Sequence, residues 1–259
     1  RALGVGVGNA VITVDDTADL DAAAEKIRLS KTLDLAASCS SDNAVVLLDD
    51  IYEPMLEKLK AQGGYLCNEE EKAALRSTLW DDELHINTAM VAQPPKKIAQ
   101  MAGLSIPEGV NFFIVPEDGW GTAHPFSGEK LSVIMALYRA RDIDHAIELT
   151  QNIQAYQGQG HSCGIYSTSD ANIMKLAEHT YTSRVMVNQP QSASNSGNVW
   201  NGMRQTFSLG CGSWGGNGTN NNISWRDLIN ETWVSMPLTE HKVIPSDDEL
   251  FGDVINQLG

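Results

Sequence analysis

The sequence predicts an α/β fold in which a largely parallel, twisted sheet is flanked by helices. The first observation behind this prediction is a set of short apolar runs, of which Ala44–Leu48 is the clearest. Such runs are hydrophobic on both faces, as are strands buried inside a parallel sheet. The second observation is that helical patterns separate these runs along most of the chain, which is the order that connects parallel strands. The 259 residues suffice for one large domain, or for one domain with an appendage.

Composition and charge exclude several classes of protein. The formal net charge is −15, whereas binding to nucleic acid or to anionic membranes requires a basic face. No apolar run approaches the roughly 20 residues that span a bilayer. We therefore expect a globular, cytoplasmic protein that binds neither nucleic acid nor membrane.

The first elements lead from a glycine-rich segment to a helix. Gly4–Asn9 runs into the apolar segment Ala10–Val14, a pattern typical of a strand that other backbone approaches closely. It resembles a phosphate-binding loop only loosely, because its glycines precede a strand and do not open a helix. The acidic segment from Asp15 to Asp19 then supplies an N-cap and a first turn for a helix that continues to about Asp34.

The middle of the chain continues this alternation. Each expected helix has an amphipathic pattern or a capping signal, and each expected strand is a short apolar run. In order, the helices are Pro54–Ala61, Asn68–Leu79, Pro95–Ala102, Asp142–Gln154 and Ala171–His179, and the strands are Asn111–Val115, Val133–Leu137, His161–Tyr166 and Arg184–Asn188. We interpret Gly63 and Gly64 as the end of the first of these helices.

The last part of the chain changes character. Gln191–Asn222 is rich in Ser, Asn and Gly, and we expect it to form an ordered loop that completes a domain over residues 1–222. Residues 223–259 form a second segment, in which Ile223–Ile229 is expected to be a short return helix. Glu231–Met236 reads as a strand with no partner within the chain, so we expect it to pair with another subunit. Residues 237–259 read as an acidic arm on the surface.

Cysteine and histidine spacing indicates neither disulfides nor a metal site. The four cysteines, Cys39, Cys67, Cys163 and Cys211, are far apart and contain no Cys-x-x-Cys pair. The six histidines are scattered as well. We therefore expect reduced thiols and no bound metal.

Cys39 is the strongest candidate for a catalytic residue. It lies among small residues in Ser30–Asn43, which leave a thiol accessible, as a nucleophile must be. The alternative is a buried and unreactive thiol, the common state of a free cysteine. Because Cys39 follows the end of a helix, the helix dipole does not favour its thiolate.

Several segments together resemble the C-terminal, catalytic half of the CoA-acylating aldehyde dehydrogenases. They occur in the order of that family over essentially the whole chain: Ser30–Thr32 with Cys39, Glu129–Ser132, Gly160–Ser162, Ser183–Asn188 and Leu209–Asn217. The first resembles the nucleophile loop of the family, and the second falls where the family carries its Glu-x-Phe-Gly-Pro element. The last is similar to a run specific to acylating members.

The resemblance implies a reaction and two roles. Cys39 would attack an aldehyde to give a thiohemiacetal, and hydride transfer to NAD or NADP would leave a thioester that CoA cleaves to acyl-CoA. Glu129 would hydrogen-bond the ribose next to the nicotinamide and orient the ring; a lone glutamate at a strand entry is otherwise usually a solvated surface residue. The backbone N–H of Cys39 would donate to the oxyanion.

Three further residues are candidates for binding or proton transfer. The resemblance suggests that His161 lies near the CoA thiol as a proton acceptor, with a histidine that caps a strand entry as the alternative. Arg184 and Arg204 are candidates for binding an anionic substrate tail through paired N–H donors, with surface salt pairing as the alternative. The implied substrate is sulfoacetaldehyde, with succinate semialdehyde or a short uncharged aldehyde as alternatives.

Two departures from the family pattern affect the expected activity. Hydrolytic members carry a water-activating glutamate where this chain has Val5, so the thioester is expected to wait for a thiol. The N-terminal Rossmann half of the family, which binds the cofactor, is absent from this sequence. We therefore expect the chain alone to bind NAD or NADP poorly and to be inactive, and the whole enzyme to be a homodimer or homotetramer.

Two other functions remain open at this stage. In the first, the chain is a non-catalytic oligomerisation domain, Glu231–Met236 drives assembly and Cys39 is vestigial. In the second, the chain belongs to a hydrolytic aldehyde dehydrogenase, although Val5 offers no carboxylate for that reaction.

Overall fold

The structure, a computed structural model, describes residues 2–240 and 243–258 of the chain. Its contacts divide the chain into two compact units, Arg1–Asp227 and Leu228–Gly259. The first unit carries the sheet and every residue that the sequence singles out for chemistry. The domain boundary expected at residue 222 stays a prediction.

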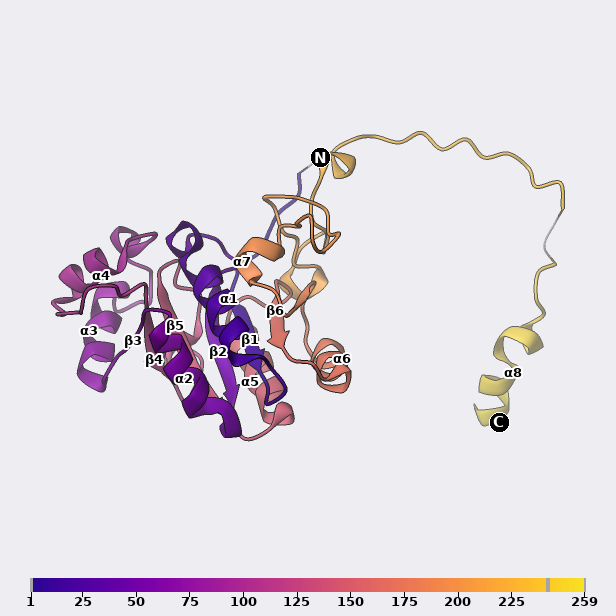
Figure 1. The fold of residues 1–259 in the computed structure, drawn as a ribbon. Coiled ribbons are helices and arrows are strands. Elements are labelled where there is room, and N and C mark those ends of the chain that lie inside the picture. The colour runs from indigo at the N-terminus through magenta and orange to yellow at the C-terminus, as the bar shows by residue number, and fades with distance from the viewer. Residues whose placement is uncertain (1, 241–242, 259) are drawn as a thin grey trace. The chain divides into compact units, whose positions relative to one another are not determined.

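A seven-stranded sheet forms the centre of the first unit (Figure 1). The strands are β1 (Ala10–Val14), β2 (Asp42–Leu48), β3 (Gly64–Leu66), β4 (Phe112–Pro116), β5 (Ile134–Ala140), β6 (Cys163–Tyr166) and β7 (Val185–Val187). They lie in the order β3-β4-β5-β2-β1-β6-β7, and each neighbouring pair is parallel. The predicted α/β fold with a parallel sheet is therefore confirmed.

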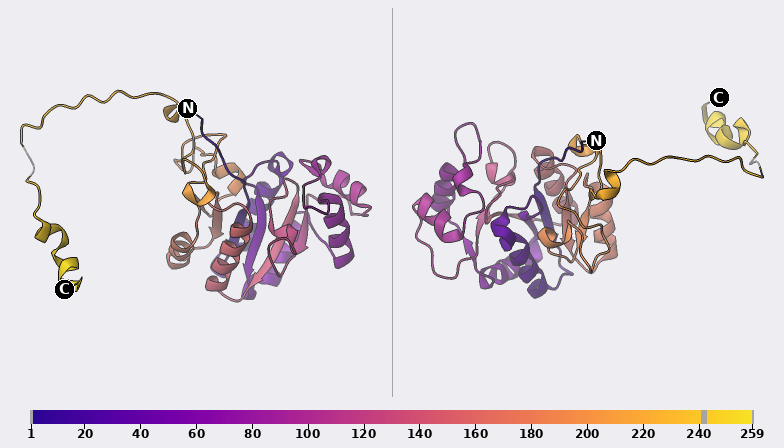
Figure 2. Two further views of the ribbon diagram at one scale, coloured as in Figure 1. Left: turned by 180° about the vertical axis from the view of Figure 1, so that it is seen from behind. Right: turned by 90° about the horizontal axis from the view of Figure 1, so that it is seen from above.

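Helices cover both faces of this sheet, which Figures 1 and 2 show from opposite sides. The helices of the first unit are α1 (Leu20–Thr32), α2 (Tyr52–Ala61), α3 (Glu69–Leu79), α4 (Pro95–Ala102), α5 (Ile143–Tyr156), α6 (Asp170–His179) and α7 (Gln191–Ser194), and α8 (Asp247–Leu258) belongs to the second unit. Helix α1 packs against α2 and α7, whereas α5 packs against α6 and three central strands. Strands β1 and β2 are buried along their whole length, as strands covered on both sides must be.

Capping residues set the helix ends where the sequence predicts them. Asp19 accepts a hydrogen bond from the Ala22 N–H at the start of α1, and Asn68 forms a capping box with Glu71 at the start of α3. Helix α4 ends at Gly103, which adopts a left-handed conformation. These local signals explain why most helix boundaries lie within a few residues of the expected ones.

Three expectations differ from the structure. The pair Gly63–Gly64 does not simply end a helix, because Gly64–Leu66 forms the edge strand β3, which is too short to give a sequence pattern. Ile223–Ile229 is not a helix but contains a single 3₁₀ turn at Trp225–Asp227. Residues 247–258 of the expected arm form α8; residues 241–242 and 259 of that arm lie outside the described residues.

The predicted strand Glu231–Met236 has no regular secondary structure in this single chain. A strand that pairs with a second subunit has no hydrogen-bonding partner in one copy, so this pairing stays a prediction. The side chains of Trp233, Val234 and Met236 are 78–90% exposed.

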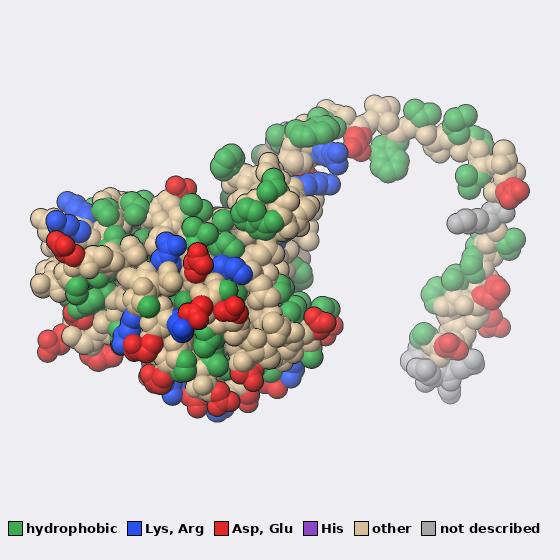
Figure 3. Space-filling view, viewed as in Figure 1, with side chains coloured by type: hydrophobic (Ala, Val, Ile, Leu, Met, Phe, Trp, Pro, Cys, Tyr) green, Lys and Arg blue, Asp and Glu red, His purple; other side chains and the backbone are tan. Residues whose placement is uncertain are grey.

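The surface carries many acidic side chains, as the composition requires. In Figure 3 they are spread over the face shown, most densely along the lower edge of the first unit, with Lys and Arg side chains among them. Within the described residues, we find no helix that is long and apolar enough to cross a membrane.

Candidate functional site

Four residues of the candidate site each come shortly before one of four neighbouring strands. Gly8 precedes β1, Cys39 precedes β2, Glu129 precedes β5 and His161 precedes β6. These strands are parallel and adjacent, so their amino ends meet at one edge of the sheet. Residues distant in sequence are brought together there, at the edge opposite to the usual ligand site of open α/β sheets.

The loop that delivers Cys39 has an unusual backbone. Helix α1 ends at Thr32, and Asp34, Leu35 and Ala36 then adopt left-handed conformations with φ of 47°, 53° and 61°. Residues with a Cβ rarely adopt this conformation, and it costs roughly 1–2 kcal/mol for each. The loop turns sharply enough to leave the Cys39 side chain half-buried, rather than enclosed in the core.

The Cys39 thiol faces the imidazole of His161. The distance between Cys39 Sγ and His161 Nε2 is 3.2 Å. The other ring nitrogen, Nδ1, is 2.9 Å from Ser162 Oγ, which also accepts a hydrogen bond from Asn195 Nδ2 at 3.3 Å. His161, Ser162 and Asn195 are almost completely buried, so this ring is held in one orientation.

Burial keeps both members of this pair uncharged at neutral pH. Desolvation raises the pKa of the Cys39 thiol to about 11, and the nearby Glu129 carboxylate raises it further. Desolvation lowers the pKa of His161 to about 4, with the Arg184 cation acting in the same direction. At pH 7 the thiol therefore faces a neutral imidazole that has a free lone pair for a proton.

A cavity of about 660 Å³ opens in front of Cys39. Its lining combines the loop before β1, the loop after α1 and the segment before β5 with residues from the region after β7. The lining includes Val7, Gly8, Leu33, Cys39, Glu129, Leu131 and Phe207. A small substrate and part of a cofactor fit in a space of this size.

Glu129 shares this cavity with Cys39. A Cβ added to Gly8 would lie 2.3 Å from the Cys39 carbonyl oxygen and 2.7 Å from Glu129 Oε1, so both residues lie against Gly8. The Gly8 N–H donates to the Glu129 carboxylate, but burial dominates and raises the pKa of Glu129 to about 7. Glu129 Oε1 has no hydrogen-bonding partner among the described residues.

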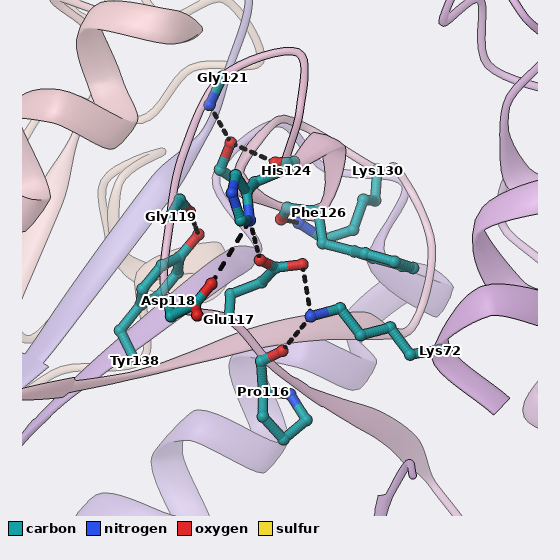
Figure 4. Close-up of polar contacts among 11 residues, drawn as sticks. Lys72, Pro116, Glu117, Asp118, Gly119, Gly121, His124, Phe126, Lys130 and Tyr138 are labelled. Carbon is teal, nitrogen blue, oxygen red and sulfur yellow. Dashed lines mark hydrogen bonds and ion pairs between the residues drawn. The ribbon is translucent and has the colours of Figure 1, made fainter. Parts of the chain in front are cut away.

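A hydrogen-bonded loop leads from β4 to Glu129 (Figure 4). Its buried Glu117 carboxylate lies 3.0 Å from Lys72 Nζ and 2.9 Å from His124 Nδ1. Further along, Lys130 Nζ donates to the carbonyl oxygens of Phe126 and Gly128 at 2.6 and 2.7 Å. These contacts fix the backbone on both sides of Glu129.

The same loop contains a group of possible metal ligands. Glu117, Asp118 and His124 each offer one ligand atom, and these atoms lie within 4.8 Å of one another. The Lys72 ammonium already pairs with the Glu117 carboxylate, and a cation at this position opposes the binding of a second one. We therefore interpret the group as a brace for the loop.

The two arginines lie away from the Cys39 cavity. Arg184 is buried and donates to Asn222 Oδ1 at 2.7 Å and to the carbonyl oxygens of His161, Gly210 and Asn220 at 3.0–3.2 Å. It thus holds the loop after β7 against the start of β6. Arg204 is exposed and lines a separate hollow of about 270 Å³ together with Arg184. That the two arginines bind an anionic substrate stays a prediction. The geometry supports it less for Arg184, because its N–H groups already donate to other residues.

Comparisons with known proteins match this chain to parts of acylating aldehyde dehydrogenases. No family model matches the chain. The sulfoacetaldehyde dehydrogenase (acylating) of Cupriavidus necator is 40% identical over 260 residues, which cover 100% of this chain and 52% of that protein. The succinate-semialdehyde dehydrogenase (acetylating) of Clostridium kluyveri is 32% identical over 252 residues, 97% of this chain and 55% of that protein.

A solved structure gives the same result. The crystal structure of an acetylating aldehyde dehydrogenase from Geobacillus thermoglucosidasius matches 94% of this chain and 54% of its own, with a TM-score of 0.89 and 32% identity. The chain is a homologue of the acylating aldehyde dehydrogenases. It spans about half the length of these relatives.

In this acylating aldehyde dehydrogenase homologue, sequence reasoning missed several residues of the site. Asn195 belongs to no motif, and Ser162, although part of the resembling segment Gly160–Ser162, has no assigned role there, so their contacts that hold the His161 ring are not predicted. Gly8 was interpreted as part of a strand entry, without its contact to Cys39. Gly8 lies just before the expected strand Ala10–Val14, and Ser162 lies at the start of the expected strand His161–Tyr166, but the sequence does not give the strand order that brings these residues together.

Proposed function

We propose that this chain is the thiol-bearing part of a CoA-acylating aldehyde dehydrogenase, with Cys39 as the nucleophile. The observation that carries the proposal is the 3.2 Å contact between Cys39 Sγ and His161 Nε2 beside a cavity that Glu129 also lines. A nucleophile, a base and a group that orients the base are the parts that covalent catalysis requires. Here Ser162 is the orienting group.

In the first half of the reaction, the Cys39 thiol adds to the aldehyde carbon. Because the resting thiol is protonated, His161 Nε2 removes its proton as the carbon–sulfur bond forms. For this the Nδ1 atom carries the other ring hydrogen and donates it to Ser162 Oγ. The product is a thiohemiacetal on Cys39.

The nicotinamide of NAD or NADP supplies the oxidation by accepting a hydride when it is bound. Glu129 Oε1 is buried beside Cys39 and lacks a partner among the described residues, so it suits a hydrogen bond from a ribose hydroxyl. Glu129 thus orients the ring toward the carbon attached to Cys39. The backbone N–H of Cys39 donates to the oxyanion, whereas the Ser40 N–H donates to Ser38 Oγ at 3.3 Å.

In the second half, CoA cleaves the Cys39 thioester and releases an acyl-CoA. His161, which has by then released the proton of Cys39 to solvent, accepts the proton of the CoA thiol as it attacks and passes it to the Cys39 sulfur as the carbon–sulfur bond breaks. Val5 lies in the segment whose neighbours Gly6–Gly8 line the cavity, and it carries no carboxylate to activate water. Thiolysis is therefore favoured over hydrolysis.

Sulfoacetaldehyde is the substrate that we rank first, and succinate semialdehyde is the second candidate. Each is the substrate named for one of the relatives, which are 40% and 32% identical to this chain. The four cysteines are free, which suits a reducing, cytoplasmic compartment. For the whole enzyme we infer a separate cofactor-binding half and a homodimer or homotetramer assembled through residues 231–236.

The test is steady-state kinetics of the enzyme that contains both halves, followed by the absorbance of the reduced nicotinamide. We expect sulfoacetaldehyde oxidation that requires CoA and is abolished by Cys39→Ser, with Cys67→Ser as the control. Equal rates with and without CoA, or wild-type turnover in Cys39→Ser, would contradict the proposal. A panel of aldehydes then separates the candidate substrates.

A further inference from the structure

Gln157 ends helix α5 next to the Cys39 site. Helix α5 runs from the carboxyl end of β5 back to the amino end of β6, so its last residues reach the edge of the sheet at which Cys39 lies. The Gln157 N–H still donates to the carbonyl oxygen of Ile153 at 3.3 Å, but the backbone at Gln157 is extended, with φ of −151° and ψ of 144°. Its half-buried side chain therefore points away from the helix.

This side chain accepts a hydrogen bond from the backbone of Glu129. Gln157 Oε1 lies 2.9 Å from the Glu129 backbone nitrogen. Gly128 makes room for the contact, because a Cβ at Gly128 would lie 2.6 Å from Gln157 Oε1. The backbone at Gly128 has a φ of −88°, which other residues adopt readily. Close approach of the Gln157 amide, and not backbone conformation, thus favours glycine at this position.

The backbone of Gln157 contacts a second segment of the site. Asn9 Nδ2 donates to the Gln157 carbonyl oxygen at 3.1 Å and to the Ser127 carbonyl oxygen at 2.8 Å. Asn9 is completely buried, so water does not compete for these hydrogen bonds. It directly follows Gly8, whose N–H donates to the Glu129 carboxylate. Gln157 therefore joins the segment before β1 to the segment before β5.

Glu129 is thus held at both of its ends. Its backbone N–H donates to Gln157, and its carboxylate accepts from Gly8. A side chain whose backbone and carboxylate are both fixed has few orientations left, and it loses little freedom when it binds a further group. Without the Gln157 oxygen, the Glu129 N–H would lack this acceptor, and the direction of its carboxylate would be less restricted.

We propose that Gln157 is a positioning residue that holds the Glu129 carboxylate in the orientation in which it accepts a ribose hydroxyl of the nicotinamide cofactor. Gln157 does not line the Cys39 cavity and acts through the backbone of Glu129. This inference rests on the proposed function of that cavity. It goes beyond the family resemblance, which implies a role for Glu129 and none for Gln157.

The first measurement is hydrogen–deuterium exchange in the enzyme that contains both halves, without cofactor. Mass spectrometry of overlapping peptides gives the exchange rate of the Glu129 amide, which depends on its hydrogen bond. Gln157→Met keeps the length of the side chain but removes the acceptor oxygen, so this amide should exchange about 3–10-fold faster. Gln157→Glu keeps an acceptor and should retain the protection of the wild type.

Gly128→Ala tests the same contact without a change at Gln157. Its methyl group would displace Gln157 Oε1, so the Glu129 amide should again exchange faster. This variant covers the case in which Gln157→Met does not fold, and circular dichroism checks each protein. Gln151→Met is the matched control, because Gln151 lies on the same helix and donates to the carbonyl oxygen of His179. It should leave the exchange of the Glu129 amide unchanged.

The second measurement is the dissociation constant of NAD and of NADP, determined by titration calorimetry of the same enzyme. The cofactor that the wild type binds should bind about 3–10-fold more weakly to Gln157→Met, because Glu129 must then be ordered on binding. Gln151→Met should bind it as the wild type does. A Gln157 that only stabilises α5 would instead raise exchange along the helix and leave cofactor binding unchanged, which would overturn the proposal.

The two proposals can fail separately. If the wild-type enzyme binds neither NAD nor NADP, the proposed function fails, and the role of Gln157 fails with it. If the wild type binds one of them and Gln157→Met binds it equally well, only the role of Gln157 fails. Equal exchange of the Glu129 amide in Gln157→Met and wild type would have the same consequence.

Discussion

At the scale of single residues, the site combines a thiol whose pKa is raised with an imidazole whose pKa is lowered. Burial keeps the proton on Cys39 and off His161, so the stable resting pair is thiol and neutral imidazole. A thiolate–imidazolium pair, by contrast, would need stabilisation by a charge or a dipole, and Cys39 follows the wrong end of α1 for that. The chemistry therefore depends on proton transfer during attack.

The first prediction concerns His161→Gln. Acylation of Cys39 by 4-nitrophenyl acetate, a reaction that requires neither nicotinamide cofactor nor CoA, should slow by about 10²–10⁴-fold near neutral pH because the base is lost. Above the pKa of Cys39, which burial raises to about 11, the two proteins should react alike, since thiolate needs no base. Release of 4-nitrophenol measures the rate, and His179→Gln, on the exposed end of α6, is the control.

His161 also determines how the rate of Cys39 acylation falls at acid pH. The pKa of His161 is lowered to about 4, so the neutral, proton-accepting form persists down to that pH. Acylation should lose its dependence on His161 only below about pH 4 and not near the ordinary histidine value of about 6.5. A fall centred near pH 6.5 would contradict the assigned environment of the ring.

The second prediction concerns the space at Gly8. In Gly8→Ala the new methyl group would lie 2.3 Å from the Cys39 carbonyl oxygen and 2.5 Å from the Cys39 Cβ, so the loop before β2 must shift. We expect the free energy of unfolding to fall by about 1–3 kcal/mol, with a changed alkylation rate at Cys39. Urea unfolding measures the change in the free energy of unfolding, and the rate of alkylation by iodoacetamide measures the effect on Cys39. Gly4→Ala, which meets nothing within 4 Å, should change neither.

At the scale of elements, the site forms where the amino ends of β1, β2, β5 and β6 lie side by side. The approximate positions of β1, β2, β5 and β6 follow from the sequence, because each is an apolar run next to a helix signal. Cys39 and Glu129 were predicted on the resemblance, and the structure places them in one cavity. The contact of His161 with Cys39 was not predictable, because it requires β2 and β6 to flank β1, and the sequence pattern carries no strand order.

The third prediction concerns the turn between α1 and β2. Ala36 has a φ of 61°, which only glycine adopts without cost. Ala36→Gly removes that strain, but it also removes a buried methyl group worth about 0.8 kcal/mol, so the free energy of unfolding should change by less than about 1 kcal/mol. Ala24→Gly, at an equally buried position in α1, should cost about 2 kcal/mol, because glycine also disfavours the helix.

Chemical denaturation of the two variants measures the difference. An Ala36→Gly protein destabilised as much as Ala24→Gly would show that the loop is not left-handed at this position. An Ala36→Val variant tests the opposite direction, because a β-branched residue tolerates this conformation poorly. It should be the least stable of the three.

At the scale of the whole molecule, the fold class was predictable and the second unit was not. Alternating helix and strand patterns are enough to predict a sheet whose strands pair in parallel. Residues 228–240 instead have no regular structure in one chain, and their large apolar side chains are exposed. The sequence pattern predicts that such a segment forms a strand that pairs with another strand, but it does not indicate which chain supplies that strand.

The last prediction concerns how the stability of the whole molecule depends on pH. Desolvation raises the pKa of Asp42 from 3.8 to about 7, so the folded state binds more protons than the unfolded state between these values. Stability therefore falls as the pH rises from about 4 to about 7, and the cost persists above it. Desolvation lowers the pKa of Lys31 from 10.5 to about 7, so the unfolded state binds more protons above pH 7, and stability rises again toward pH 10.

Asp42 and Lys31 thus contribute opposite slopes below and above pH 7, to which His161 and Lys130, whose pKa values burial lowers, add a rise with pH. Urea unfolding at a series of pH values should show that Asp42→Asn weakens the fall below pH 7, leaving the part that Glu129 contributes through its own raised pKa. Lys31→Met should remove the part of the rise above pH 7 that Lys31 contributes, leaving the part that Lys130 contributes. The exposed Asp50→Asn and the half-buried Lys26→Met are the controls and should leave both slopes unchanged. Differences between wild type and Asp42→Asn or Lys31→Met that stay constant from about pH 4 to about pH 10 would contradict the burial of these two groups.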